Sequence, residues 1–198
     1  MDMNQVETIE SMRVDAVRSR RLNGTVAISV ALLATFLAIC KVKDENIVQG
    51  MQQAQADKLD HWAYYQARNI RQDLAESTLL QLQLLRTRPG MGATADIDPL
   101  IQRQKDQVLN QQTKKAELKK QAEADQVRYD ELNFRDDQFD LAEALMAITL
   151  ALLAVTALTR LWWLYWLSLL PTAGGVVMGL SGLLGWGLHP DALVRLLS

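Results

Sequence analysis

The stretch PGMGATADIDP, residues 89–99, interrupts a long run of helix-forming sequence and sets the architecture that we expect. Residues 41–140 are rich in Gln, Ala, Leu, Lys, Glu and Arg, and their only two prolines are the first and last residues of this stretch. The Pro-Gly pair at its start ends one helix, while the Asp-Pro pair at its end is typical of an N-cap followed by proline at the first helical position. The sequence therefore predicts two arms of nearly equal length, about 44–88 and 98–140, joined at a tip near 89–98.

Three uncharged runs on either side of this insert are long enough to cross a membrane. They cover residues 24–40, 144–159 and 161–188, and the first of them reads GTVAISVALLATFLAIC. A helix needs about 20 apolar residues, and at least roughly 17, to cross a hydrocarbon core of ~30 Å. We expect transmembrane helices at residues 24–40, 141–160 and 161–188, because the second run can borrow a few residues upstream.

The predicted fold class is all-α, with three transmembrane helices and a long antiparallel, coiled-coil-like helical hairpin between the first and second spans. Residues 1–23 form an N-terminal amphiphilic tail, residues 41–140 the extramembrane hairpin, and residues 189–198 a C-terminal tail. A buried core helix is the alternative for the first run alone. Three such runs leave no polar face from which to build a globule.

The spacing of residues along the two arms supports their pairing. The second arm carries an unbroken series of positions at steps of three or four, about half of them apolar, which favours coiled-coil packing. The series is Ile101, Gln104, Val108, Gln111, Lys115, Leu118, Ala122, Asp125, Tyr129, Leu132, Asp136 and Phe139. On the first arm we expect the matching face at Leu59, Trp62, Gln66, Ile70, Leu74 and Ser77. Residues 42–140 intersperse 14 basic with 17 acidic side chains, so no basic stripe for nucleic acid is expected.

Three aromatic residues stand close together in DHWAYYQARNIRQ, residues 60–72. Trp62 lies too far beyond the first span to belong to an aromatic belt at the membrane interface. Trp62 and Tyr65 share a helix face, whereas Tyr64 points elsewhere, with Arg68 one turn further on. We interpret these four residues as candidate hairpin or oligomer contacts, with a subunit contact around Tyr64. Stacking of Tyr64 on Arg68 and simple exposure are the alternatives.

This segment, followed much later by LTRLWWLYWLSL at residues 158–169, resembles the bacterial family known as domain of unknown function 4337. The most specific part of the resemblance is Trp62-x-x-Tyr65-Gln66-Ala67, and the resemblance covers most of residues 24–187. It implies a small three-span membrane protein with a long helical insert between the first two spans. It implies no activity that could be assigned to particular residues.

No pattern in the sequence indicates catalysis, so we expect a non-enzymatic protein with no cofactor and no catalytic, cofactor-binding or metal-binding residues. His61 and His189 lie on different segments without a Cys or Glu-x-x-His pattern, and no strand precedes a Gly-rich loop. The single cysteine, Cys40, is interpreted as a membrane-embedded thiol that packs as a small hydrophobe. Cleavage and lipidation at LAIC is the alternative, but Ile39 occupies the site that needs a small residue.

Charges and small residues near the spans give the remaining candidates. Lys41, Lys43, Asp140 and Glu143 lie at the expected membrane boundary. An intramembrane carboxylate at Glu143 would favour an ion path, but at this depth a salt-linked or solvated role is expected. In the third span, glycine spacing of the GxxxG type lets helix backbones approach closely, within one subunit or between subunits. The candidate packing glycines are Gly175, Gly179 and Gly182.

Aromatic and basic residues predict how the chain lies in the membrane. Trp162, Trp163, Tyr165 and Trp166 are expected to anchor the third span at the headgroup level, with a ligand cage as the alternative. Arginines cluster before the first span and supply the only charge between the last two spans: Arg13, Arg18, Arg20, Arg21 and Arg160. The positive-inside rule then favours a cytoplasmic N-terminus with the hairpin on the other side, and the resemblance to a bacterial family implies an inner membrane protein with a periplasmic hairpin. Lys41 and Lys43 favour the opposite orientation.

These observations predict a homo-oligomeric structural or interaction scaffold that projects a helical hairpin from the membrane. Its expected partners are membrane lipid, further copies of itself and an envelope protein, but not nucleic acid. The alternative is an oligomeric channel or transport component. That alternative requires polar side chains facing a lumen, and those available in the spans are mostly Ser, Thr and Glu143.

Overall fold

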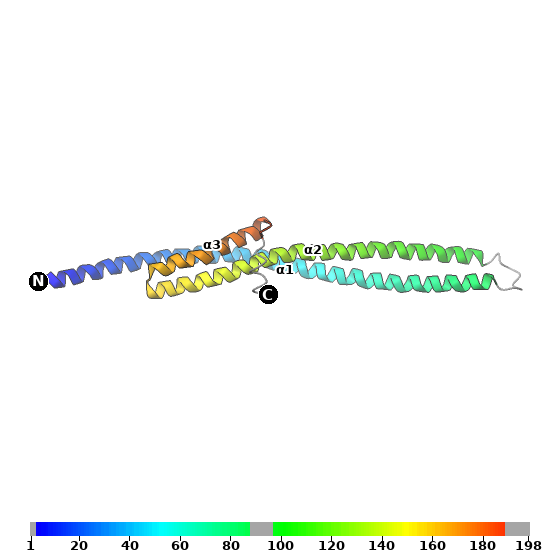
Figure 1. The fold of residues 1–198 in the computed structure, drawn as a ribbon, viewed down its shortest axis with the longest axis horizontal. Helices are drawn as coiled ribbons and strands as arrows, with labels where there is room; N and C mark the ends of the chain where they lie inside the picture. The colour runs from blue at the N-terminus through cyan, green and yellow to red at the C-terminus, as the bar shows by residue number, and fades with distance from the viewer. Residues whose placement is uncertain (1–2, 88–96, 189–198) are drawn as a thin grey trace. The chain divides into compact units, whose positions relative to one another are not determined.

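In a computed structural model, the chain is all-helical over the residues that the structure describes, 3–87 and 97–188 (Figure 1). The helices are α1 (Met3–Arg86), α2 (Asp98–Thr159) and α3 (Trp162–Leu184). No strand occurs within the described ranges, which confirms the all-α class. The predicted C-terminal tail at 189–198, and most of the predicted tip at 89–98, lie outside the described residues.

The helix ends follow local sequence signals. Helix α1 runs without interruption from the expected tail through the first span into the insert, because it contains no proline. It ends at Arg86, shortly before Pro89, and α2 begins at Asp98 with Pro99 in its first turn, where proline is favoured. Arg86 Nε lies 3.2 Å from Asp98 Oδ1, so an ion pair joins the end of α1 to the start of α2.

A tight connection separates α2 from α3. Arg160 adopts a left-handed backbone conformation with φ 56°, and Leu161 is extended at the N-cap of α3. At its other end α3 closes on Gly185, also left-handed with φ 70°, while the Trp186 N–H donates to the Ser181 carbonyl at 3.0 Å. This is the usual way in which a glycine terminates a helix.

All three helices are long and apolar enough to cross a membrane. Their apolar side chains are widely exposed in the single chain, for example Leu158 at 84% and Leu170 at 74%. Such surface is unfavourable in water, but it is favourable against lipid tails, where a helix also satisfies its own backbone hydrogen bonds. The sequence prediction of three membrane-length helices is therefore confirmed.

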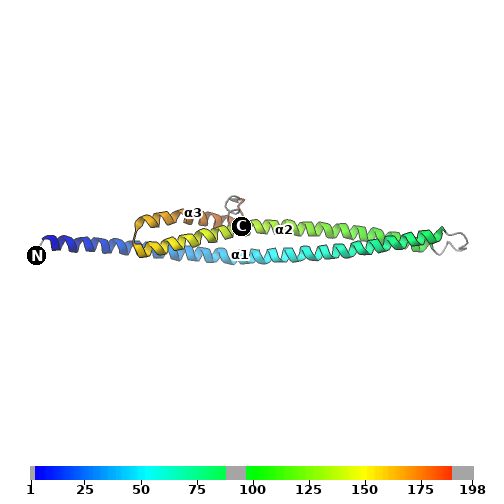
Figure 2. The same ribbon diagram turned by 60° about the horizontal axis from the view of Figure 1, so that its bottom comes forward.

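Contacts divide the chain into two compact units. The span unit comprises Met1–Gln49 with Leu132–Ser198, and the insert unit comprises Gly50–Glu131. In the span unit, α3 lies beside α1 and α2 in both views (Figures 1 and 2). One core cluster there is Leu22, Val26 and Leu153, and a second is Leu141, Ala142 and Met178.

In the insert unit, the described segments of α1 and α2 lie side by side (Figures 1 and 2). Polar side chains connect them at intervals along their length. The hydrogen-bonded pairs are Lys58 with Gln126, His61 with Asp125, Arg68 with Gln111, and Asn69 with Lys115. The two pairs nearer the start of α1 engage residues 125 and 126 of α2, and the two pairs further along α1 engage residues 111 and 115.

Candidate functional site: two opposite faces of helix α1

The aromatic residues singled out in the sequence divide between two environments. The rings of Trp62 and Tyr65 meet edge to face, with centroids 5.3 Å apart and an interplanar angle of 77°. The Lys115 ammonium of α2 lies 5.8 Å from the centroid of the Tyr65 ring, within the range of a cation–π interaction. Tyr64, by contrast, is 63% exposed. The structure thus brings Trp62 and Tyr65 together and leaves Tyr64 on the surface.

Arg68 is turned toward α2. Its Nη1 donates to Gln111 Oε1 at 3.1 Å, and one residue later Asn69 Oδ1 accepts from Lys115 Nζ at 2.9 Å. His61 Nδ1 lies 2.6 Å from Asp125 Oδ2. Half-buried polar side chains that hydrogen-bond to one another therefore form part of the contact between the two helices.

Nine positions of the expected α2 series, from Ile101 to Tyr129, fall within the insert unit, and all nine are buried or half-buried, as expected. The expected α1 face is wrong at five of its six positions, and Trp62 alone among them is half-buried. Leu59, Ile70 and Leu74 are 62%, 68% and 67% exposed, and Gln66 and Ser77 are exposed as well. The residues that turn inward form a different series at steps of three or four, which we call the inner face. It consists of Ala54, Lys58, His61, Tyr65, Arg68, Gln72 and Ala75, all buried or half-buried.

The physical reason for this correction is polar pairing. The α2 series is itself half polar, so its Gln, Lys and Asp side chains require donors and acceptors from the partner helix. The inner face provides them at Lys58, His61 and Arg68, which bond to Gln126, Asp125 and Gln111. A more apolar face would give these half-buried groups no partner on α1, at part of the cost of about 1–3 kcal/mol that a fully buried unsatisfied group carries.

The α1 residues that were expected at the contact but are exposed belong to an outer stripe on the opposite side of α1. The outer stripe comprises ten positions at steps of three or four: Gln52, Ala56, Leu59, Ala63, Gln66, Ile70, Leu74, Ser77, Gln81 and Leu84. Every one is exposed and none is charged. Ile70 follows His61 by nine residues, or two and a half turns, so the stripe and the inner face point in opposite directions. Tyr64 lies between them.

The three candidate glycines all lie where α3 packs closely on the other two helices of the same chain. A Cβ added to each would approach a neighbouring side chain within 3.2 Å or less. Gly175 faces Met146 at 3.2 Å and Gly182 faces the Phe139 ring at 2.7 Å, both on α2, while Gly179 faces the Phe36 ring on α1 at 2.8 Å. The structure thus places these glycines in packing within one subunit.

Charges near the ends of the first two spans also meet. Lys41 Nζ lies 3.3 Å from Glu143 Oε1, with both side chains about half exposed, so the pair contributes at most about 1 kcal/mol. Lys43 and Asp140 are exposed. Within residues 3–87 and 97–188, no group of three or more His, Cys, Asp or Glu side chains is arranged to hold a metal ion.

A pair of acids close to these charges was missed in the sequence. Asp44 of α1 and Asp136 of α2 share a side-chain hydrogen bond. Burial, with the nearby charges of Asp140 and Asp44, raises the pKa of Asp136 to about 6. Burial is also the main cause of the raised pKa of Asp44, which is half-buried. The available signal was that Asp44 and Asp136 stand four and five residues outside their respective predicted spans.

These raised pKa values predict that acid stabilises the span unit. The folded state holds the Asp136 proton more tightly than the unfolded chain, where the pKa takes its ordinary value of 3.8. The stabilisation is therefore complete below about pH 4 and is lost as the pH rises through about 6. We expect Asp136→Asn to remove much of this loss and to stabilise the fold at pH 8 by on the order of 1 kcal/mol. Thermal unfolding of the wild type and the variant in detergent, between pH 4.5 and 8, measures this dependence of stability on pH.

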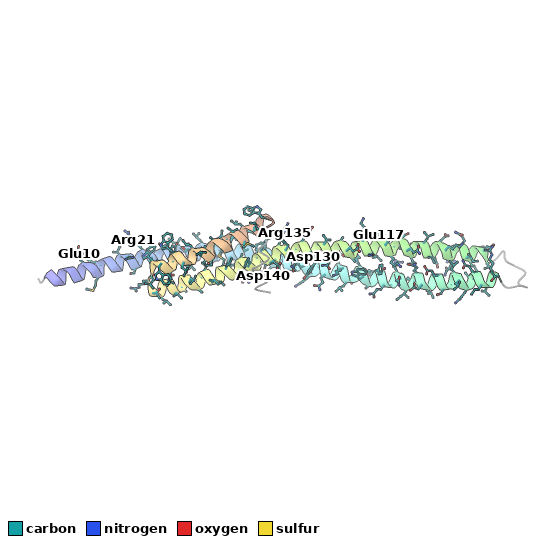
Figure 3. The ribbon with its side chains drawn as sticks, in the orientation of Figure 1. Glu10, Arg21, Glu117, Asp130, Arg135 and Asp140 are labelled. Carbon is teal, nitrogen blue, oxygen red and sulfur yellow. The ribbon has the colours of Figure 1, made fainter. Side chains whose placement is uncertain are left out.

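The matched control is Glu117→Gln, which removes one exposed acid of α2 in the insert unit (Figure 3). It should leave the pH dependence unchanged. An Asp136→Asn protein with the wild-type pH profile would show that the acid pair does not couple folding to protons.

The fold and its contacts define a class: helical proteins with three membrane-length helices and a long helical insert. Within that class, the chain belongs to the family described as Domain of unknown function (DUF4337), whose model matches residues 22–185. The match begins at Leu22, a fully buried core residue, and ends at Gly185, the C-cap of α3. No curated protein matches the chain. No solved structure matches it either.

Proposed function

We propose that this protein is a non-enzymatic, homo-oligomeric membrane scaffold, in which the insert forms an antiparallel, coiled-coil-like hairpin and α1 joins two copies through its outer stripe. The observation that carries the proposal is the stripe itself: ten uncharged, exposed positions at coiled-coil spacing, directly opposite the face that contacts α2. The order of the hydrogen-bonded pairs along α1 and α2 supports the antiparallel hairpin.

A second copy of the chain is the occupant that fits the stripe. In two copies anchored in one membrane, equal residue numbers lie equally many residues from the first span. The stripe therefore meets itself in register, Ala63 against Ala63 and Ile70 against Ile70, and no like charges oppose each other. Parallel pairing of two identical helices needs this self-complementarity.

The expected strength is sufficient for association within a membrane. Covering Leu59, Ile70, Leu74 and Leu84 by about half in both copies contributes on the order of 5–10 kcal/mol per dimer. Association in solution costs at least about 4 kcal/mol. Anchoring both copies in one bilayer raises their effective concentration and lowers that cost.

Hydrogen bonding in the spans favours a scaffold over the channel alternative. Three buried hydroxyls bond to carbonyl groups of their own helices: Thr149 to Leu145 at 2.9 Å, Thr156 to Leu152 at 2.7 Å, and Ser168 to Tyr165 at 2.7 Å. Side chains that serve an ion path would instead present their polar groups to a lumen.

We place the scaffold in a bacterial inner membrane with its N-terminus in the cytoplasm and its hairpin in the periplasm. The arginines before the first span and Arg160 support this orientation under the positive-inside rule. In this arrangement the exposed Tyr64 is available to an envelope protein.

Placing charge on the stripe tests the proposal. Ile70→Glu combined with Leu74→Glu puts four carboxylates into the pairing surface, so we expect the wild-type oligomer to become largely monomeric. Native mass spectrometry in mild detergent measures the oligomeric state. The hairpin should still fold, because neither side chain is buried in the single chain.

The matched control is Leu109→Glu combined with Val127→Glu. It introduces the same charge at two exposed apolar positions of α2 and should leave the oligomer intact. A monomeric wild type, or an oligomer that persists in the α1 double variant, would overturn the proposed function.

A further inference from the structure

An open groove of about 800 Å³ lies between α1 and α3 at the N-terminal side of the span unit. Three arginines of α1, Arg13, Arg18 and Arg21, line it together with Trp162 and Trp166 of α3. Among the described side chains that line it, Glu10 is the one acid; Glu10 and Arg21 are labelled in Figure 3. The groove therefore combines an excess of positive charge with an aromatic wall.

The aromatic wall is held in place by contacts beneath it. Tyr165 meets Trp162 and Trp166 edge to face, with centroids 6.1 Å apart in each pair. The Tyr165 hydroxyl lies 3.2 Å from Ser29 Oγ of α1, so the three rings are tied to both helices. Trp162 also packs against the buried cluster of Leu22, Val26 and Leu153. A wall fixed in this way loses little entropy when a ligand binds.

Exposed apolar side chains continue from the groove along the spans. Ile28 and Leu32 follow Arg21 by two and three turns of α1, and Leu170 follows Trp166 by one turn of α3. The two helices run in the same direction here, because Tyr165 meets Ser29 and, further along, Gly179 meets Phe36. Positive charge is thus followed on both helices by apolar surface.

We propose that this groove is a binding site for an anionic phospholipid. The guanidinium groups of Arg13, Arg18 and Arg21 hold the phosphate, for which their planar donors are well suited. Trp162 and Trp166 contact the glycerol region at headgroup depth, and the acyl chains lie along Ile28, Leu32 and Leu170. The apolar surface beyond the arginines favours a lipid over a free phosphate, because only a lipid has acyl chains that can contact this surface.

This site is independent of the proposed oligomer, since its residues come from one chain. The three arginines also precede residue 22, where the family match begins, so the basic side of the groove belongs to the part of this chain outside that match.

The test is a lipid titration of the full-length protein in detergent, followed by native mass spectrometry. The probes are phosphatidylglycerol and phosphatidylcholine with identical acyl chains, and inorganic phosphate as a competitor. We expect phosphatidylglycerol to bind roughly tenfold more tightly than phosphatidylcholine, and phosphate not to displace it. Arg13→Gln combined with Arg21→Gln should weaken phosphatidylglycerol binding by roughly tenfold or more, at about a factor of five per arginine.

The matched control is Arg20→Gln combined with Arg128→Gln, which removes the same charge at exposed positions outside the groove and should preserve binding. Should the double variant fail to fold, Arg13→Gln alone tests the site, and we expect it to weaken phosphatidylglycerol binding by a few fold. Equal binding of the two lipids, displacement by phosphate, or an equal loss in the control would each overturn the site.

Discussion

Gly182→Ala is expected to destabilise the packing of α3 on α2 by about 1–3 kcal/mol, although it adds a single methyl group. The new Cβ would lie 2.7 Å from the Phe139 ring, closer than carbon atoms approach without displacement. Phe139 is itself buried, so the ring can move only by shifting its neighbours or by separating the helices. Unfolding of the detergent-solubilised protein with increasing denaturant measures the change.

Gly24→Ala is the matched control, because its added Cβ has no neighbour within 4 Å. Alanine is the better helix former, so this change should be neutral or stabilising by up to about 1 kcal/mol. Phe139→Leu should recover part of the stability lost in Gly182→Ala, because the two positions share one contact. Equal effects at Gly182 and Gly24 would contradict the close packing of α3.

Gln138→Met should cost about 1–3 kcal/mol through lost hydrogen bonds. Gln138 is fully buried on α2, and its Nε2 donates to the carbonyls of Trp186 at 2.8 Å and Leu188 at 2.6 Å, with Ser181 Oγ at 3.1 Å. It therefore holds the residues that follow the C-cap of α3. Methionine keeps the volume but donates no hydrogen bond, which leaves these acceptors without the amide.

Hydrogen exchange of the amides near the end of α3, together with global unfolding, separates this local effect from a general one. Gln112→Met, at an exposed position of α2, is the control and should change neither measurement. If Gln138→Met behaves like the control, the Gln138 amide does not hold the end of α3.

Features that depend on neighbouring residues in the chain could be predicted from the sequence. Proline and glycine end α1 and begin α2 near the expected positions, and the length of an uncharged run shows directly whether it can cross a membrane. The α2 series was also predictable, since a helix buries the face on which its 3–4 spacing continues without a break.

Features that depend on a choice between partners could not be predicted. The insert segment of α1 carries two series at the same spacing, and apolarity favours the one containing Leu59 and Ile70 as the contact with α2. Only the positions of Gln111 and Asp125 on the other helix select the polar series instead. The Asp44–Asp136 pair was missed for the same reason, because the two residues meet only after the helices have packed.

The central claim is that α1 uses one face within the chain and the opposite face between copies. A disulfide cross-linking scan in intact membranes, with single cysteines introduced into a Cys40→Ser background, tests it most directly. Cysteines at Ala63 and Ile70 on the outer stripe should give covalent dimers, whereas those at Asp60 and Arg71, about 80–100° around the helix from Ile70, should give few. Equal cross-linking at all four positions, or none at Ala63 and Ile70, would contradict the claim.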